Sequence, residues 1–318
     1  MVPRWTLVVE GLGKIERAEV RTHPLMLFVG PNNSGKSYLA SVLWGLLNLP
    51  TNFFQDGDLA TEAGRAGLSV VDRVIEKTLR GGEYALAAED MQALVAFLND
   101  TLRRRANALA EYVFNAAEVS LRRIAVEDFT AVGPGMVLVG RDERSAEEIH
   151  PLEKKLILGT LVRRALDGSE RMRDLVSPSY RPGDAVFLPA SRTGFMLFYK
   201  QVLESQLQGL WRTFRDRPEG LKLPTPGLHF LTLLATGLQP EPGPFAVEAD
   251  FLERRALDGT LVMRPIGPSH DFEYRIGPDQ TPLSLDLASS LVTELAPLVL
   301  VLRHIKQLPV LLFEEPEG

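Results

Sequence analysis

The chain of 318 residues contains no cysteine. This excludes disulfides, thiol catalysis and zinc or iron–sulfur sites with cysteine ligands. Histidine is scarce as well, and its five positions show no ligand spacing, so we expect no dedicated transition-metal site. We interpret each histidine as an ordinary surface or core residue. The five are His23, His150, His229, His270 and His304.

Long apolar runs are also missing. No window approaches the ~20 apolar residues of a membrane-spanning helix, and the N-terminus MVPRWTLVVEGLGK lacks a basic region followed by a long apolar segment. We therefore expect a soluble, cytoplasmic protein with no membrane partner. The net charge of −6 gives no general reason to expect nucleic-acid binding, so such binding would need a local basic patch.

The stretch FVGPNNSGKSYLASVL is the most informative part of the chain. The preceding run PLMLFVG, residues 24–30, is apolar throughout, which is typical of a strand buried on both faces of a sheet. The segment that follows the glycine-rich loop has apolar residues at helical spacing, and Asn48 and Pro50 end this helix. Its apolar positions are Leu39, Val42, Leu43, Leu46 and Leu47.

The loop between the two matches the pattern GxxxxGK[ST] through Gly30, Gly35, Lys36 and Ser37. Glycines let the backbone wrap a phosphate chain, and the N-terminus of the next helix adds its dipole. We expect Lys36 to reach the β- and γ-phosphates of ATP and Ser37 to bind Mg²⁺. A chance match in a turn is the alternative, but the flanking strand and helix patterns favour a nucleotide site. The predicted cofactor-binding residues here are Gly30, Pro31, Asn32, Asn33, Ser34, Gly35, Lys36, Ser37 and Tyr38.

The last segment, PVLLFEEPEG, is an apolar run that ends in acidic residues. Open α/β sheets bind their ligands at the carboxyl ends of their strands. We therefore predict that Glu314 lies in the outer shell of Mg²⁺ and that Glu315 is the general base that activates water. Glu315 and Lys36 are the predicted catalytic residues. The alternative is a solvated acidic terminus, which the glycine loop makes less attractive.

The remaining patterns suggest a discontinuous domain. Residues 5–20 alternate like a β-hairpin, and residues 56–180 have helical periodicity, interrupted by a predicted β pair at 129–141. We expect an ATPase head formed by residues 1–55 and 181–318, with 56–180 as a mainly helical insertion. One apolar stripe in this insertion comprises Met91, Leu94, Val95, Leu98, Leu102, Leu109 and Val113.

The C-terminal part begins with AVFLPASRTG, residues 185–194, which has the pattern of a buried strand ending in small and polar residues. Residues 250–267 and 270–283 are predicted to be strands with glycine turns. Residues 287–305 are predicted to be a helix that the serines open.

These segments together resemble a known family. GPNNSGKSYLA after a hairpin, PASR at a strand end, serines that open a helix and then LLFEEPE are similar to the ABC-type AAA ATPases of the overcoming-lysogenization-defect (OLD) group and their RecF and SMC relatives. The resemblance covers about the first 50 and the last 130 residues. It implies an α/β P-loop NTPase fold, like an ABC-ATPase head, with an N-terminal β-hairpin sheet and a helical insertion.

The resemblance also implies roles for residues outside the loop. Heads of this type dimerise around two ATP molecules, so Ser289 and Ser290 would contact the γ-phosphate across a homodimer, or else form an ordinary N-cap. Leu291 stands where the family usually has glycine, which argues against close approach of the backbone. Arg192 would sense the phosphate or link it to the insertion, and the alternative is a salt-bridge partner.

The insertion is rich in arginine, which allows two interpretations. The arginines could line a DNA path, but we prefer a solvated helical face. The residues concerned are Arg103, Arg104, Arg105, Arg122, Arg123, Arg163 and Arg164.

The resemblance implies an ATP-hydrolysing head that drives a nuclease or other effector in DNA repair or anti-phage defence. The family continues after EEPE into a helix and a histidine-containing loop, whereas this sequence stops at Gly318, so we expect a fragment or strands supplied from elsewhere. The alternative function is a scaffold that binds ATP without appreciable hydrolysis. A P-loop kinase is a third class, which the hairpin and the paired glutamates argue against.

Overall fold

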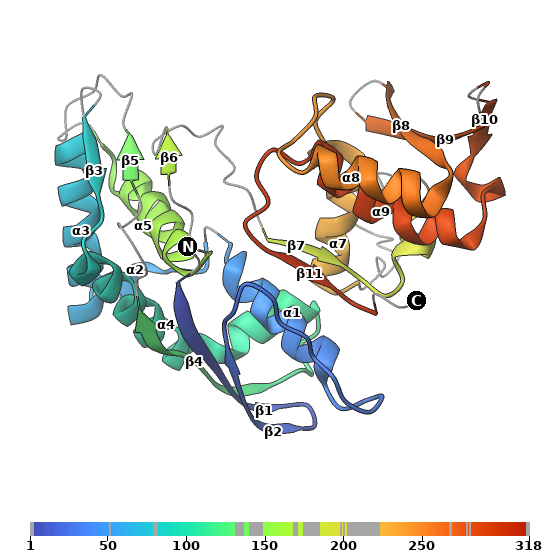
Figure 1. Ribbon diagram of the computed structural model, residues 1–318. Coiled ribbons are helices and arrows are strands. Elements are labelled where there is room, and N and C mark those ends of the chain that lie inside the picture. Colours follow the sequence, from blue (N-terminus) through green and yellow to red (C-terminus); the bar gives the residue numbers. More distant parts are fainter. Residues whose placement is uncertain are drawn as a thin grey trace, which may run out of the picture. The chain divides into compact units, whose positions relative to one another are not determined.

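The computed structural model describes residues 3–50, 52–78, 82–130, 137–139, 149–167, 171–173, 185–197, 199, 201, 223–266, 269–277, 279 and 281–315. The chain divides into two compact units, Met1–Asp184 and Ala185–Gly318, each mixed α/β with small sheets (Figure 1). Each unit is described by itself below. The discontinuous division into head and insertion stays a prediction.

The N-terminal unit contains the predicted hairpin. Strands β1 (Arg4–Leu12) and β2 (Ile15–Arg21) pair antiparallel, with Leu12 opposite Ile15. Gly13, in the turn between them, has a φ of 55°, a left-handed conformation that glycine adopts without strain. A third strand, β4 (Leu121–Thr130), pairs with the other edge of β1 and completes the order β2-β1-β4.

The predicted β pair at 129–141 is wrong as a pair. Strand β4 pairs with β1, whereas β5 (Val137–Val139) lies between β3 (Glu83–Ala85) and β6 (Arg171–Arg173) in a separate sheet. Residues 131–136 and 140–141 of the predicted pair lie outside the described residues. Alternating apolar and polar residues indicate that a segment is extended, but the strand with which it pairs depends on tertiary packing.

The helices of the N-terminal unit follow the predicted periodicity. They are α1 (Lys36–Leu47), α2 (Asp56–Leu59), α3 (Glu62–Thr78), α4 (Ala88–Phe114) and α5 (Pro151–Asp167). The predicted stripe on α4 is confirmed, since all seven of its residues are buried. Helix α1 ends at Leu47 with Asn48 as its C-cap, as expected. Its apolar positions Val42, Leu43, Leu46 and Leu47 are buried, and Leu39 is partly exposed.

Two specific contacts tie these helices to their neighbours. The amide of Asn99 on α4 donates to the carbonyl of Val126 and accepts from its N–H, at 2.7 and 2.8 Å. A Cβ atom at Gly45 of α1 would lie 2.2 Å from Cγ2 of Val113, so α1 and α4 approach closely only because residue 45 is glycine. Helix α4 therefore contacts both the hairpin sheet, through β4, and the C-terminal half of α1.

The predicted buried strand at residues 24–30 is the main departure from expectation. The structure has no strand there, and the side chains of Leu25, Leu27 and Val29 are 89%, 75% and 82% exposed. A strand needs a hydrogen-bonded neighbour, and none of the strands described in this unit pairs with this run. The run is apolar, as the sequence shows, but apolar composition alone does not provide a hydrogen-bonded partner strand.

The C-terminal unit has a two-stranded parallel sheet of β7 (Val186–Leu188) and β11 (Leu311–Phe313), with Leu312 opposite Phe187. Both were predicted as buried strands. All three residues of β7 are buried, whereas in β11 only Leu312 is. The carboxyl ends of the two strands lie side by side because the strands run in the same direction.

A second sheet of this unit is the antiparallel β8 (Gly259–Ile266), β9 (Ser269–Ile276) and β10 (Thr281–Ser284). Strands were predicted over both 250–267 and 270–283, but residues 250–257 are helical instead. They belong to α8 (Ala246–Leu252) and the π-helical turn η4 (Glu253–Leu257). The guanidinium of Arg303 on α9 (Ser290–His304) binds both carboxylate oxygens of Glu253 at 2.7 Å and so ties η4 to α9.

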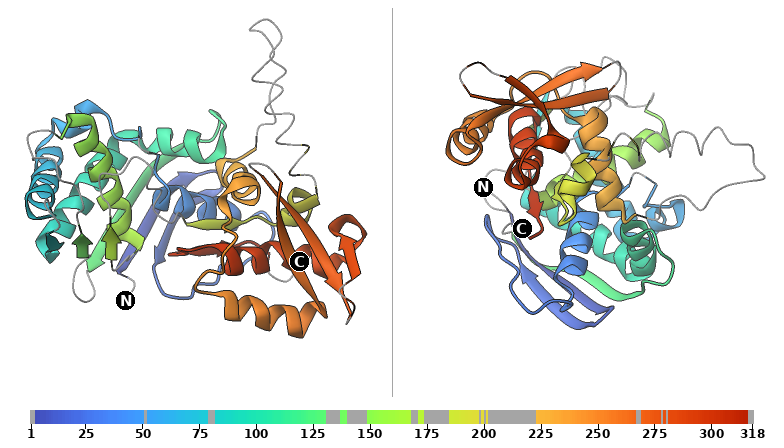
Figure 2. Two further views of the ribbon diagram at one scale, coloured as in Figure 1. Left: turned by 90° about the horizontal axis from the view of Figure 1, so that it is seen from above. Right: turned by 90° about the vertical axis from the view of Figure 1, so that its right-hand side faces the viewer.

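Helix α9 (Ser290–His304) is the centre of the C-terminal core. Val299, Leu300 and Val301 are completely buried in it, and α9 runs alongside α8 in both figures (Figures 1 and 2). The remaining elements are α7 (Thr225–Thr232), the π-helical turn η3 (Leu233–Gly237) and the 3₁₀ turn η5 (Leu285–Leu287). Among the residues that the structure describes, every helix is too short or too polar to cross a membrane.

Candidate functional site

The glycine loop of the N-terminal unit has the backbone shape that its residue types predict. Asn33 and Gly35 have left-handed φ angles of 62° and 96°. Gly35 is the N-cap of α1, and its carbonyl accepts from the N–H of Leu39 at 2.9 Å. A Cβ atom at Gly35 would lie 2.7 Å from Cγ1 of Ile15 on β2. Residue 35 is therefore glycine for its φ angle and for its close approach to the hairpin.

Lys36 folds back over this loop. Its ammonium donates to the carbonyls of Gly30 and Pro31, both at 2.8 Å, so the side chain spans the loop from end to start. Ser37 and Tyr38 follow in the first turn of α1, which contains no acidic residue. The first N–H groups of a helix have no partner within it, and an anion is favoured there by the helix dipole. The loop, Lys36 and α1 thus form a cationic concave surface.

Tyr38 also supports the loop. Its ring lies against the ring of Phe114 at the end of α4, with a centroid distance of 4.7 Å, and closes over Gly13 of the hairpin turn. The Tyr38 side chain remains 41% exposed. A predicted site residue thus has a packing role in addition to any contact with a ligand.

A cavity of about 540 Å³ opens beside the loop, which is within the ~300–1,000 Å³ range of small-molecule sites. Strand β2, the exposed run at 27–29 and the loop form its walls. Its cationic lining residues are Lys14, Lys36 and Arg17, of which Arg17 pairs with Glu10 and Glu19. Its apolar lining residues are Ile15, Leu27, Phe28, Val29 and Leu39. The other lining residues are Glu16, Ala18, Ser34 and Gly35. A ligand with an anionic end and an apolar ring suits these walls.

The acidic pair lies in the C-terminal unit, where β11 ends. The N–H of Glu314 donates to the carbonyl of Leu188 at 3.0 Å, and one carboxylate oxygen of Glu314 accepts from the N–H of Ala190 at 3.2 Å. Glu315 is exposed and has a left-handed φ of 48°. Such a conformation is uncommon for glutamate and is often found at functional sites.

Arg192 is completely buried directly beneath this pair. It donates to the carbonyls of Glu314 at 2.8 Å and Glu315 at 3.0 Å, forms an ion pair with Glu294 on α9, and its guanidinium carbon lies 4.5 Å from the ring centroid of Phe313. The salt-bridge interpretation of Arg192 is therefore observed. Contact between Arg192 and a nucleotide stays a prediction.

Ser289 is the N-cap of α9 and accepts from the N–H of Val292 at 3.4 Å. Ser290 begins the helix and is exposed, with Leu287 and Leu291 exposed on either side of the serines at 70% and 51%. The ordinary N-cap arrangement is thus present for Ser289, and contact of either serine with a phosphate across a dimer stays a prediction.

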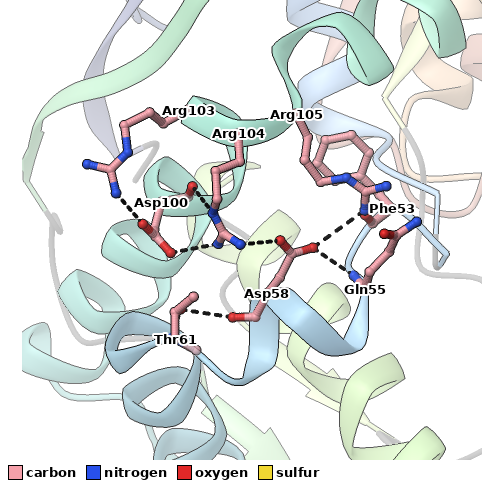
Figure 3. A network of polar contacts seen from close by, with 9 residues as sticks. Phe53, Gln55, Asp58, Thr61, Asp100, Arg103, Arg104 and Arg105 are labelled. Carbon is pink, nitrogen blue, oxygen red and sulfur yellow. Dashed lines mark hydrogen bonds and ion pairs between the residues drawn. The ribbon is translucent and has the colours of Figure 1, made fainter.

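The insertion arginines are mostly paired with carboxylates. Arg104 binds Asp58 at 2.8 Å and Asp100 at 2.7 Å, Arg103 binds Asp100, and Arg105 donates to the carbonyl of Phe53 (Figure 3). Arg122 and Arg123 lie on β4, so the expected helical face is wrong for them, and Glu10 pairs with both. Arg164 is buried against Asp167 at 2.6 Å, so its expected solvent exposure is wrong too.

The structure thus places the predicted site residues in two groups. Residues 30–38 lie together in the N-terminal unit, and Arg192, Glu314 and Glu315 lie together in the C-terminal unit. The convergence of the two groups on one triphosphate stays a prediction. Glu294 was not predicted, although its position four residues after Ser290 places it on the same helix face as the serines.

The described residues contain no group of three or more histidine, aspartate or glutamate side chains able to bind a metal ion. Comparison of the chain with protein-family models, with curated proteins and with solved structures found no match.

Proposed function

We propose that this chain is an ATP-binding P-loop NTPase, similar to the head of an ABC-type ATPase. The observation that carries the proposal is the loop at residues 30–37, where left-handed Gly35 turns the backbone into α1 and Lys36, bonded to the loop carbonyls, lines a cavity with both cationic and apolar residues. Phosphates would bind to the loop N–H groups and the α1 terminus, and the base would face the apolar wall.

Lys36 can exchange its two carbonyl contacts for phosphate oxygens, since all of these are acceptors. Ser37 would bind Mg²⁺ and Glu314 would lie in the outer shell of the ion, which supplies positive charge to the phosphates when bound. Glu315 would take a proton from the attacking water.

The proposal requires the apolar run at 24–30 to gain a strand partner. Three of its side chains are at least 75% exposed, and in the described residues β7 and β11 pair only with each other. Parallel sheets are normally larger and covered on both faces. The strand partner of residues 24–30 and the convergence of the loop with the acidic pair both stay predictions. Closure of two heads around ATP would then drive a nuclease or other effector, with DNA as a potential ligand.

The test compares Lys36→Ala with a matched control, Lys77→Ala, which removes an exposed lysine of α3. Calorimetric titration with Mg-ATP should show binding by the parent and the control. Loss of a charged hydrogen-bond donor should weaken binding by Lys36→Ala at least ~10-fold. Equal affinity in all three proteins would contradict the proposed site.

Glu315→Gln tests hydrolysis separately. It should keep ATP binding, slow hydrolysis roughly 10²- to 10⁴-fold and trap a dimer in size-exclusion chromatography with ATP. Parental turnover by this variant would show that Glu315 is not the base. If the parent binds ATP but does not hydrolyse it with any candidate partner, the scaffold function is the better one. A phosphorylated small-molecule product would instead indicate a kinase.

A further inference from the structure

We propose that Arg192 is a positioning residue that couples the start of α9 to the acidic end of β11, so that Glu315 and the serine-opened helix terminus move as one body. The inference concerns the mechanism of the proposed ATPase and rests on that function. The coupling itself, however, is a property of the C-terminal unit that can be measured without ATP.

The first observation is that the donors of Arg192 are directed into the protein. Its side chain is 0% exposed, and its donors reach three separate segments. Besides the two glutamate carbonyls, Nη1 donates to the carbonyl of Pro189 at 3.3 Å and Nε to that of Glu294 at 3.4 Å. The end of β7, the end of β11 and the first turns of α9 therefore meet at one guanidinium.

The second observation is the chemistry of the contacts. Nη1 and Nη2 bind the carbonyls of two successive residues, Glu314 and Glu315, which suits the planar fork of arginine and not the point charge of lysine. Glu294 compensates the buried charge, and the hydroxyl of Thr193 donates to its other carboxylate oxygen. Removing one partner of such a buried pair leaves an uncompensated charge.

The third observation is the backbone of Glu315. Its left-handed φ of 48° is unfavourable for glutamate, and Nη2 of Arg192 holds its carbonyl at 3.0 Å. The direction of the Glu315 side chain depends on this backbone conformation. Glu294 lies one turn after Ser290, at the N-terminus of α9. If this end of the helix moves, Glu294 moves with it, Arg192 follows through its ion pair with Glu294, and the backbone of Glu315 follows through its hydrogen bond with Arg192.

The primary experiment is hydrogen exchange without nucleotide, for the parent, Glu294→Gln, Arg192→Lys and the control Arg254→Met, which removes an exposed arginine of η4. Glu294→Gln keeps the volume of a side chain on α9. We expect exchange in the peptide covering residues 311–315 to rise roughly tenfold or more, because Glu294→Gln removes the carboxylate that holds Arg192 in place and Arg192→Lys removes the two donors to the carbonyls of Glu314 and Glu315. An effect confined to α9, or an equal effect of the control, would overturn the coupling.

The kinetic experiment distinguishes positioning from a purely structural role. Arg192→Lys should lower kcat at least tenfold per folded molecule, with Mg-ATP affinity changed less than threefold, because the loop lies in the other unit. The double variant Arg192→Lys/Glu294→Gln should be no slower than Arg192→Lys alone, since both changes break one connection. Additive effects, or a lower melting temperature with unchanged kcat, would overturn the inference.

The outcomes also separate this inference from the proposed function. If the parent fails to bind ATP, the proposed function is wrong, and the exchange data still decide whether Arg192 couples the segments. If Arg192→Lys does not fold, Glu294→Gln alone carries both measurements, since it retains every contact of Arg192 with β7 and β11.

Discussion

Replacement of Gly35 by alanine tests the geometry of the loop directly. The added Cβ would lie 2.7 and 2.8 Å from Cγ1 and Cδ1 of Ile15, and the residue would keep a φ of 96°. The left-handed conformation costs about 1–2 kcal/mol for a residue with a Cβ atom. Overpacking adds about 1–3 kcal/mol, at the lower end here because the ends of the Ile15 side chain can shift.

A gain of about 0.4–1 kcal/mol from the reduced freedom of the unfolded chain opposes these costs. We therefore expect Gly35→Ala to lower the free energy of unfolding of the N-terminal unit by about 1–3 kcal/mol. Urea unfolding followed by tryptophan fluorescence is suitable, because Trp5 and Trp44 are buried in this unit. ATP binding should weaken in parallel, since the loop can no longer close against β2.

Gly57→Ala is the matched control, because a Cβ atom at this position of α2 meets nothing within 4 Å. It should leave stability unchanged or raise it slightly. The double variant Gly35→Ala/Ile15→Ala removes the clash and keeps the unfavourable φ, so it separates the two costs. Parental stability and ATP affinity for Gly35→Ala would refute the loop geometry.

Two further predictions concern charged and titratable groups. Asp58→Ala should destabilise the N-terminal unit by about 2–4 kcal/mol in urea unfolding, because it removes a buried carboxylate that pairs with both Arg104 and Arg105 (Figure 3). Asp56→Ala, at a 95% exposed carboxylate, should cost about 0–1 kcal/mol. Burial lowers the pKa of His304, so at a given acidic pH the unfolded chain binds more protons at this residue than the folded chain does. The free energy of unfolding should therefore fall as the pH drops below about 6.5, the usual pKa of histidine. His304→Gln should flatten this dependence of stability on pH between pH 7.5 and 5.

Local patterns in the sequence were sufficient for several elements. The hairpin follows from its alternation, the stripe on α4 and the ends of α1 from helical spacing, and the loop from the conformational freedom of Gly35. These features depend on residues close together in the chain, so the sequence carries the whole signal. The serine at the start of α9 was recognised for the same reason.

Other features depend on residues far apart in the chain. Residues 24–30 have the composition of a buried strand, but whether they form one depends on a pairing strand that composition cannot identify. Residues 250–257 are helical instead of extended, and Glu253 among them binds Arg303, about fifty residues later in the chain. The arginines of the insertion acquired carboxylate partners in the same way, and these partners neutralise much of the charge that suggested DNA binding.

The sequence by itself therefore determined the local features, namely a glycine-rich loop that matches GxxxxGK[ST], an acidic strand end and a serine-capped helix, because each is encoded within about ten residues. Only the tertiary structure decided that Arg192 is buried beneath Glu314 and Glu315 and bound to Glu294. Glu294 and the acidic pair lie about 100 and 120 residues along the chain from Arg192. A local sequence pattern cannot predict these contacts of Arg192, because they form only when distant segments pack together and exclude water from its guanidinium.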